Sequence, residues 1–200
     1  MSPSSAENVL DFIRARGVVR ARDLEAAGLP RIWLTRLTRL GLVERVGRGL
    51  YVATDAQWTE HHTFAEVAVR VPHGVICLLS ALSYHGLTTQ GPFEVWLAID
   101  RKARAPHEPG LPLRVVRFSG AALTTGVEEH SIEGATVRVY SPAKTVVDCF
   151  RYRNKIGLDV ALEALRDCYR QRLATVDDLW ACASTLRAAT VMRPYLKSLQ

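Results

Sequence analysis

The feature that most constrains this chain is a series of short elements between residues 18 and 52. The pattern predicts a helix over residues 22–27, a Gly28-Leu29-Pro30 turn, a second helix up to Leu40, and a hairpin with the tip Gly47-Arg48-Gly49. Two helices joined by a short turn and followed by a hairpin are typical of a winged helix-turn-helix. The second helix of such a unit enters the major groove of DNA.

The second predicted helix has two different faces. Pro30 suits its first position, because the fixed φ of proline is helical and its missing N–H would be unpaired there anyway. At about 100° per residue, one face is apolar and the other carries Arg and Thr. The apolar face is predicted to hold Trp33, Leu34, Leu37 and Leu40, and the polar face Arg31, Thr35 and Arg39, flanked by Ile32, Arg36 and Thr38.

Arg can donate paired hydrogen bonds to guanine, and Thr can contact thymine. If the leucines dock the helix, the polar face points outward, and we expect it to contact base edges. The alternative is an ordinary solvated arginine face. The residues expected to bind DNA in this helix are Arg31, Thr35, Arg36, Thr38 and Arg39.

Charge gathers in the same stretch. Residues 14–48 hold nine arginines and three acids, a net charge of +6 that equals that of the whole chain. A positive excess confined to one segment is expected of a phosphate-binding surface. In the hairpin, Arg45 and Arg48 are therefore predicted to face DNA phosphates.

A length of 200 residues suits one small and one larger domain, here predicted at residues 1–57 and 58–200. A hydrophobic content of 48% and a charged content of 23% are typical of a globular protein. The sequence lacks an apolar run of about eighteen residues, so no membrane span is expected. The first residues do not resemble a signal peptide, which favours a cytoplasmic protein.

No metal or other cofactor is expected from the cysteines and histidines. Cys77, Cys149, Cys168 and Cys182 are isolated from one another and are predicted to be reduced, buried thiols. The adjacent His61 and His62 have no partner at the spacing of zinc ligands.

The larger part has a mixed pattern that predicts an α+β domain, with a small β-sheet and a helical C-terminal block. A helix is expected over residues 60–70, and a buried helix over most of 75–82, ended by Gly86. Residues 102–112 are expected to form a mobile loop. Strands are predicted at residues 94–99, 113–118, 127–132 and 136–140, and further helices near 142–152, 158–172, 175–184 and 187–199.

These segments together resemble the AbiEi family, the antitoxins of abortive-infection type IV toxin–antitoxin systems. The resemblance extends over "GRGLYV", "LLSALSYHGLT", "EVWLAI" and "VRVYSPAKTVVDCFRY". Its most specific pieces are Ser80-Ala81-Leu82 with His85-Gly86-Leu87, and Tyr140-Ser141-Pro142-Ala143-Lys144-Thr145 with Val147-Asp148. The resemblance implies a DNA-binding autorepressor in phage defence, whose larger domain counters a co-encoded nucleotidyltransferase-like toxin.

The expected nucleic-acid partner is double-stranded DNA of the protein's own promoter. One winged helix reads only a few base pairs, which is too little information to select one promoter in a genome. Two copies of the chain are therefore expected on a repeated sequence.

No catalytic residue is expected. Ser80 and His85 would lie about 140° apart on a helix, and Lys144 with Asp148 is more simply a structural ion pair. The main enzymatic alternative is a Mg²⁺-dependent nuclease that uses Glu94 and the D-x-K sequence Asp100-Arg101-Lys102. A regulator whose second domain binds a small effector also remains open.

A toxin would need a surface on the larger domain. The C-terminal helices carry arginines interleaved with tyrosines, side chains that are frequent at interface hot spots. Arg166, Tyr169 and Arg170 are the predicted contacts, within a wider set that includes Arg151, Tyr152, Arg153, Lys155 and Arg172. The alternatives are a solvated charged face, or contacts made by the loop at 102–112.

Overall fold

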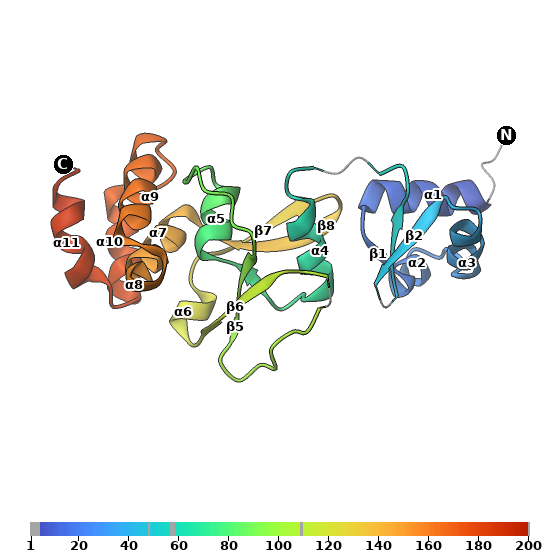
Figure 1. Ribbon diagram of the computed structural model, residues 1–200, viewed down its shortest axis with the longest axis horizontal. Helices are drawn as coiled ribbons and strands as arrows, with labels where there is room; N and C mark the ends of the chain where they lie inside the picture. Colours follow the sequence, from blue (N-terminus) through green and yellow to red (C-terminus); the bar gives the residue numbers. More distant parts are fainter. Residues whose placement is uncertain (1–4, 48, 57–58, 109, 200) are drawn as a thin grey trace. The chain divides into compact units, whose positions relative to one another are not determined.

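The computed structural model describes residues 5–47, 49–56, 59–108 and 110–199 (Figure 1). The chain divides into two compact units. The first is Met1–Pro72 with Ser131–Val137, and the second is His73–His130 with Arg138–Gln200. Helices and sheets occur together, which confirms the predicted α+β class with a small N-terminal part. The predicted domain boundary falls at residues 57 and 58, outside the described residues, and stays a prediction.

The N-terminal unit contains the predicted order of helix, turn, helix and hairpin. Its strands form one antiparallel sheet in the order β1-β3-β2, with Val19 opposite Tyr51 and Val43 opposite Ala53. The first helix was not predicted, although Val9, Leu10 and Ile13 give it a buried apolar stripe. The elements are α1 (Ser5–Arg16), β1 (Val19–Arg20), α2 (Ala21–Ala26), α3 (Ile32–Arg39), β2 (Val43–Gly47), β3 (Leu50–Ala53) and α4 (His62–Arg70).

The prediction that Pro30 begins the second helix was wrong. α2 ends in a glycine turn, in which the N–H of Gly28 donates to the carbonyl of Glu25 at 3.0 Å and that of Leu29 donates to Leu24 at 2.8 Å. Gly28 has a φ of 71°, which favours glycine there. This turn occupies the chain up to residue 29, so Pro30 precedes the helix and α3 begins at Ile32.

The turn between β7 (Val127–Ile132) and β8 (Ala135–Tyr140) packs closely against the end of α1. A Cβ added at Gly134 would lie 2.4 Å from the Cα of Arg16, and one at Gly17 would lie 2.5 Å from the carbonyl oxygen of Glu133. Both glycines have a positive φ. Only glycine permits this approach of two backbones without a shift of one of them.

Glu133 forms the polar part of this contact. Its carboxylate accepts hydrogen bonds from the Thr59 N–H at 2.8 Å, the Thr59 hydroxyl at 2.9 Å and Nδ1 of His62 at 2.7 Å. Burial opposes ionisation, but these hydrogen bonds outweigh it and hold the pKa of Glu133 below its ordinary value. The contact fixes the segment before α4.

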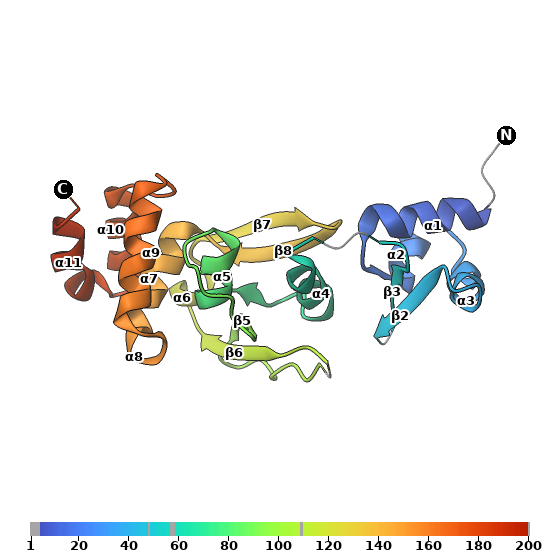
Figure 2. The ribbon, with the colours of Figure 1, turned by 45° about the horizontal axis from the view of Figure 1, so that its top comes forward.

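The second sheet has the order β6-β5-β4-β8-β7, and Figure 2 shows β7 and β8 side by side. β4 is antiparallel to β5 and parallel to β8, while β5 and β6 are parallel, so the sheet is mixed. The predicted strands all occur, with ends that shift by at most one residue. The remaining elements are β4 (Val75–Ile76), α5 (Leu78–Tyr84), β5 (Val95–Asp100), β6 (Leu113–Phe118), α6 (Ala121–Thr124), α7 (Pro142–Arg151), α8 (Arg153–Ile156), α9 (Leu158–Arg170), α10 (Val176–Thr185) and α11 (Ala189–Lys197).

The expectation of helix from residue 75 was wrong at its start. Val75 and Ile76 form β4, which pairs with Ala98 and Leu97 on one side and with Val139 on the other. A central strand is apolar on both faces, so its sequence is a continuous apolar run that periodicity does not distinguish from a buried helix. The neighbouring strands decided between the two.

A buried ion pair lies in the main core of the second unit. Lys144 and Asp148, both fully buried, form an ion pair one turn apart on α7, and Arg151 donates to the same carboxylate at 2.8 Å. The ammonium group also lies 3.9 Å from the ring centre of Tyr140. Burial lowers the pKa of Lys144 and raises that of Asp148. The predicted ion pair is confirmed.

The cysteines are unpaired as predicted, but the prediction that all four are buried was wrong for one of them. All four cysteines are free, and Cys77, Cys149 and Cys168 are buried while Cys182 is half-buried. Burial raises the pKa of Cys77 and Cys149. Among the described residues, no helix combines the length and the hydropathy needed to span a membrane.

Replacing one partner of the buried pair should be more harmful than replacing both. Asp148→Ala leaves the Lys144 ammonium buried without its carboxylate, so we expect a loss of about 3–5 kcal/mol in the free energy of unfolding. The double variant Lys144→Met, Asp148→Leu should recover part of that loss. Urea unfolding followed by circular dichroism measures both, and equal losses in the two variants would contradict the account.

The Glu133 contact should depend on pH. Because the folded chain lowers the pKa of Glu133, its stabilisation is present at neutral pH and is lost as the pH falls through that lowered value. We expect Glu133→Ala to lose about 1.5–3 kcal/mol at pH 7 and to approach wild type in acid. Hydrogen exchange at the Thr59 amide reports the contact, and Glu129→Ala, on an exposed position of β7, is the control. Unchanged exchange in Glu133→Ala at pH 7 would contradict the prediction.

Candidate nucleic-acid interface

Two leucines dock α3 in the N-terminal unit. Leu34 and Leu37 are 2% and 1% exposed, and they belong to the core formed with α1, α2 and the sheet. The opposite side of the helix is exposed. We call this side the outward face of α3, and its residues are Ile32, Thr35, Arg36 and Arg39.

The predicted apolar face was too wide. Leu40 is 69% exposed, because it follows the last residue of the helix, and Gly41 with a φ of 71° then turns the chain toward β2. Trp33 is half-buried, and the guanidinium of Arg36 lies 4.8 Å from its ring centre. Ile32, predicted only as a flank, is 55% exposed. It adds an apolar side chain to the outward face.

Two of the predicted contacts already use their polar groups within the unit. Arg31 donates to the carboxylate of Glu25 at 3.1 Å. The hydroxyl of Thr38 donates to the carbonyl of Leu34, one turn earlier, at 2.7 Å. The structure therefore brings Thr35, Arg36 and Arg39 together on one face, and it places Arg31 and Thr38 beside that face.

The hairpin positions one of the two predicted phosphate contacts. Arg45 is exposed on β2, and its Nε donates to the carbonyl of Gly47 at 3.1 Å, next to an irregularity in the β2–β3 register. Arg48 lies outside the described residues.

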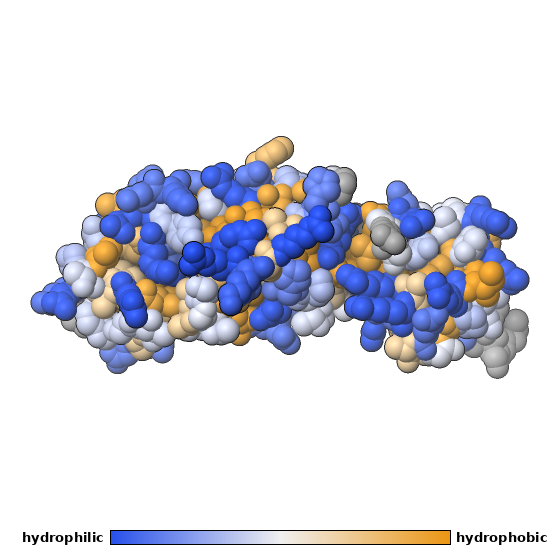
Figure 3. All heavy atoms as spheres, turned by 90° about the horizontal axis from the view of Figure 1, so that it is seen from below, coloured by the Kyte–Doolittle hydropathy of each residue, from blue (hydrophilic) through white to orange (hydrophobic). Residues whose placement is uncertain are grey.

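Other arginines of residues 14–48 already interact with groups of the folded chain. Arg14 forms ion pairs with Asp55 and Asp11, and its hydrogen bond lowers the pKa of Asp55. Arg20 donates to the carbonyl of Val69, and Arg16 lies 4.9 Å from the ring centre of Phe12. Figure 3 shows hydrophilic residues next to small apolar patches on one face of the chain. The net charge of the stretch thus overstates the charge free to meet a phosphate.

The residues considered for catalysis have other contacts. Glu94 directly precedes β5, and Asp100 is the last residue of that strand. Six residues of extended chain separate their backbones by about 20 Å, so the two carboxylates do not share one metal ion. Asp100 accepts a hydrogen bond from the Lys102 N–H at 2.7 Å. Ser80 accepts one from the Trp96 N–H, and His85 donates one to the carbonyl of Tyr140.

The predicted toxin contacts lie on the C-terminal half of α9. Arg166, Tyr169 and Arg170 are all exposed and are spaced for one side of the helix. Arg170 pairs with Asp167 at 2.9 Å. Tyr169 and Arg170 line a hollow of about 480 Å³. Arg151, in the wider set, is instead directed to the buried Asp148.

Residues 7–54 match a family model described as a transcriptional regulator, AbiEi antitoxin. The match begins within α1 and ends just after β3, so it covers most of α1, the two following helices and the hairpin, but only a short part of the chain. No match was found among curated proteins.

A solved structure extends the likeness to nearly the whole chain. The crystal structure of the RV2827C protein from Mycobacterium tuberculosis matches with a TM-score of 0.60 and 16% sequence identity. The match covers 97% of this chain and 76% of that one. At this identity the likeness shows a common fold.

Proposed function

We propose that this protein is a DNA-binding transcriptional regulator and antitoxin that represses its own operon and counters a co-encoded nucleotidyltransferase-like toxin. In this proposal the helices and hairpin of the N-terminal unit act as a winged helix-turn-helix. The larger unit counters the toxin without catalysing a reaction. The match of residues 7–54 to the antitoxin regulator family supports the regulatory part.

The observation that carries the DNA-binding proposal is the outward face of α3. Leu34 and Leu37 fix the helix to its core, so Thr35, Arg36 and Arg39 point to solvent from a rigid support. Arg can donate to guanine O6 and N7, Thr can bond to a base edge, and an exposed Ile32 can contact a thymine methyl group. Arg45 on the hairpin is suited to a phosphate.

The alternative of a nuclease is less well supported. Of its two carboxylates, Glu94 precedes β5 and Asp100 is the last residue of that strand, and Glu94 lies 3.5 Å from the guanidinium of Arg114. A non-enzymatic regulator needs neither residue for its action.

Threonine variants provide a matched test of the outward face. Thr35→Val removes a hydroxyl that faces solvent, whereas Thr38→Val removes one that donates to its own helix. We expect Thr35→Val to weaken binding to promoter DNA and Thr38→Val to leave it nearly unchanged. Arg39→Ala should cost about 1–3 kcal/mol and relax preference at one base pair.

Fluorescence anisotropy with promoter and scrambled DNA at several salt concentrations measures these effects. Arg45→Ala should weaken both DNAs alike and reduce the salt slope, because phosphate contacts position the protein without reading sequence. Arg14→Ala is the charge control, since that side chain is already paired with Asp55. Equal effects of Arg39→Ala and Arg14→Ala would refute the proposed interface.

We expect two copies of the chain on the promoter, each on one half of a repeat, since one recognition helix contacts few base pairs. Footprinting at saturation should protect both halves, and a promoter with one half scrambled should bind with lower affinity. A single short protected segment on the intact promoter would contradict this expectation.

A further inference from the structure

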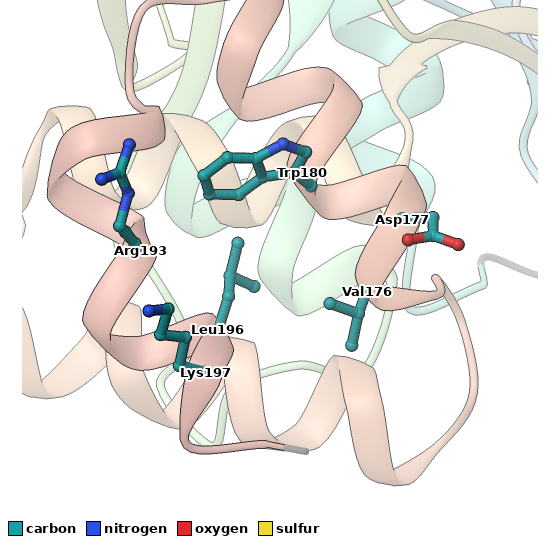
Figure 4. A pocket seen from close by; sticks show the side chains of 6 residues that line it. All are labelled: Val176, Asp177, Trp180, Arg193, Leu196 and Lys197. Carbon is teal, nitrogen blue, oxygen red and sulfur yellow. The ribbon is translucent and has the colours of Figure 1, made fainter.

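The second unit has a groove between its last two helices, shown in Figure 4. We call it the α10–α11 groove. Its volume is about 350 Å³. It is lined by Val176, Asp177 and Trp180 from α10 and by Arg193, Leu196 and Lys197 from α11.

The base of the groove is apolar. Leu196 is 3% exposed and points toward Trp180 in Figure 4, and Val176 is half-buried. Trp180 itself is 38% exposed, an unusual amount for so large an apolar side chain. Tryptophan is one of the side chains enriched among the residues that contribute most of the binding energy at protein interfaces.

The rim of the groove carries positive charges that favour a negatively charged group on a partner. Arg193 and Lys197 lie one turn apart on α11, both exposed, and neither has an ion pair within the described part of the chain. By contrast Arg170, Arg151 and Arg14 have carboxylate partners. Asp177, on the other wall, lies in the first turn of α10, where the free N–H groups of the helix favour a negative charge. The positive charges on the α11 wall of the groove therefore have no carboxylate partner among the described residues.

A second hollow continues the surface. It is formed by Tyr169, Arg170, Arg172, Ala174, Thr175 and Val176, and it shares Val176 with the α10–α11 groove. Tyr169 is 42% exposed. Two aromatic side chains and several cations thus border one continuous surface from the end of α9 to α11.

We infer that the α10–α11 groove binds a segment of a partner protein that carries a carboxylate next to an apolar side chain. The apolar side chain packs on Trp180 and Leu196, and the carboxylate pairs with Arg193 and Lys197. Four of the six lining residues are exposed, so the groove does not enclose a small ligand.

This inference deepens the proposed antitoxin role and rests on it for the identity of the partner, the co-encoded toxin. The surface extends the predicted contacts at Tyr169 and Arg170 onto two further helices. Trp180, Arg193 and Lys197 were not predicted from the sequence.

The test uses the full-length chain and the purified toxin encoded next to it. The charge reversal Arg193→Glu, Lys197→Glu should weaken toxin binding by about tenfold or more in calorimetry, and Trp180→Ala by a similar factor. The toxin affinity of the neutral double variant Arg193→Gln, Lys197→Gln should lie between those of the wild type and the charge-reversal variant. The matched control is Arg101→Glu, Arg187→Glu, which makes the same charge change at two exposed positions outside the groove lining and outside the loop at 102–112.

Retained promoter binding and an unchanged circular dichroism spectrum establish that each variant is folded. If wild type rescues cells but does not bind the toxin, the groove inference fails and the antitoxin proposal stands. If wild type neither binds nor rescues, both fail. Equal weakening by the groove reversal and the control reversal, or binding that single-stranded RNA abolishes by competition, also overturns the inference.

Discussion

The burial of Leu34 and Leu37 fixes the orientation of α3, and the candidate interface depends on that orientation. With these two side chains in the core, the 3.6-residue period leaves Thr35, Arg36 and Arg39 on the opposite side. Loss of either leucine would weaken the packing of the helix that carries every outward residue. A substitution in the core of this unit is therefore also a substitution in the interface.

A second constraint acts on the backbone at the end of α1. Gly17 and Gly134 let two chain segments approach to a distance that a Cβ would prevent. The carboxylate of Glu133 then holds Thr59 and His62. Residues more than 70 positions apart thus belong to one compact unit.

Charge is distributed differently in the two units. In the N-terminal unit, Asp55 and Glu25 pair with Arg14 and Arg31, so fewer cations are free than the sequence contains. In the larger unit, the Lys144 ammonium is fully buried with Asp148 and contributes nothing to the surface. Among the described residues, the exposed cations without a carboxylate partner include Arg36 and Arg39 on α3 and Arg193 and Lys197 on α11.

The sequence by itself determined the order of elements and their periodicity. The turn at Gly28, the leucine spacing of α3 and the strands from residue 94 onward follow from local conformational preferences, which act over a few residues. The tertiary structure decided what depends on distant neighbours. Val75 and Ile76 became a strand because β5 and β8 flank them, and Leu40 became exposed because no element covers it.

The same division holds for the candidate sites. The type and spacing of Thr35, Arg36 and Arg39 were visible in the sequence, because one helix carries all three. The sequence did not show that the polar groups of Arg31 and Thr38 are already hydrogen-bonded, because their partners, Glu25 and the Leu34 carbonyl, are brought to them by the fold. The α10–α11 groove was equally hidden, since Trp180 and Arg193 become neighbours only when two helices pack together.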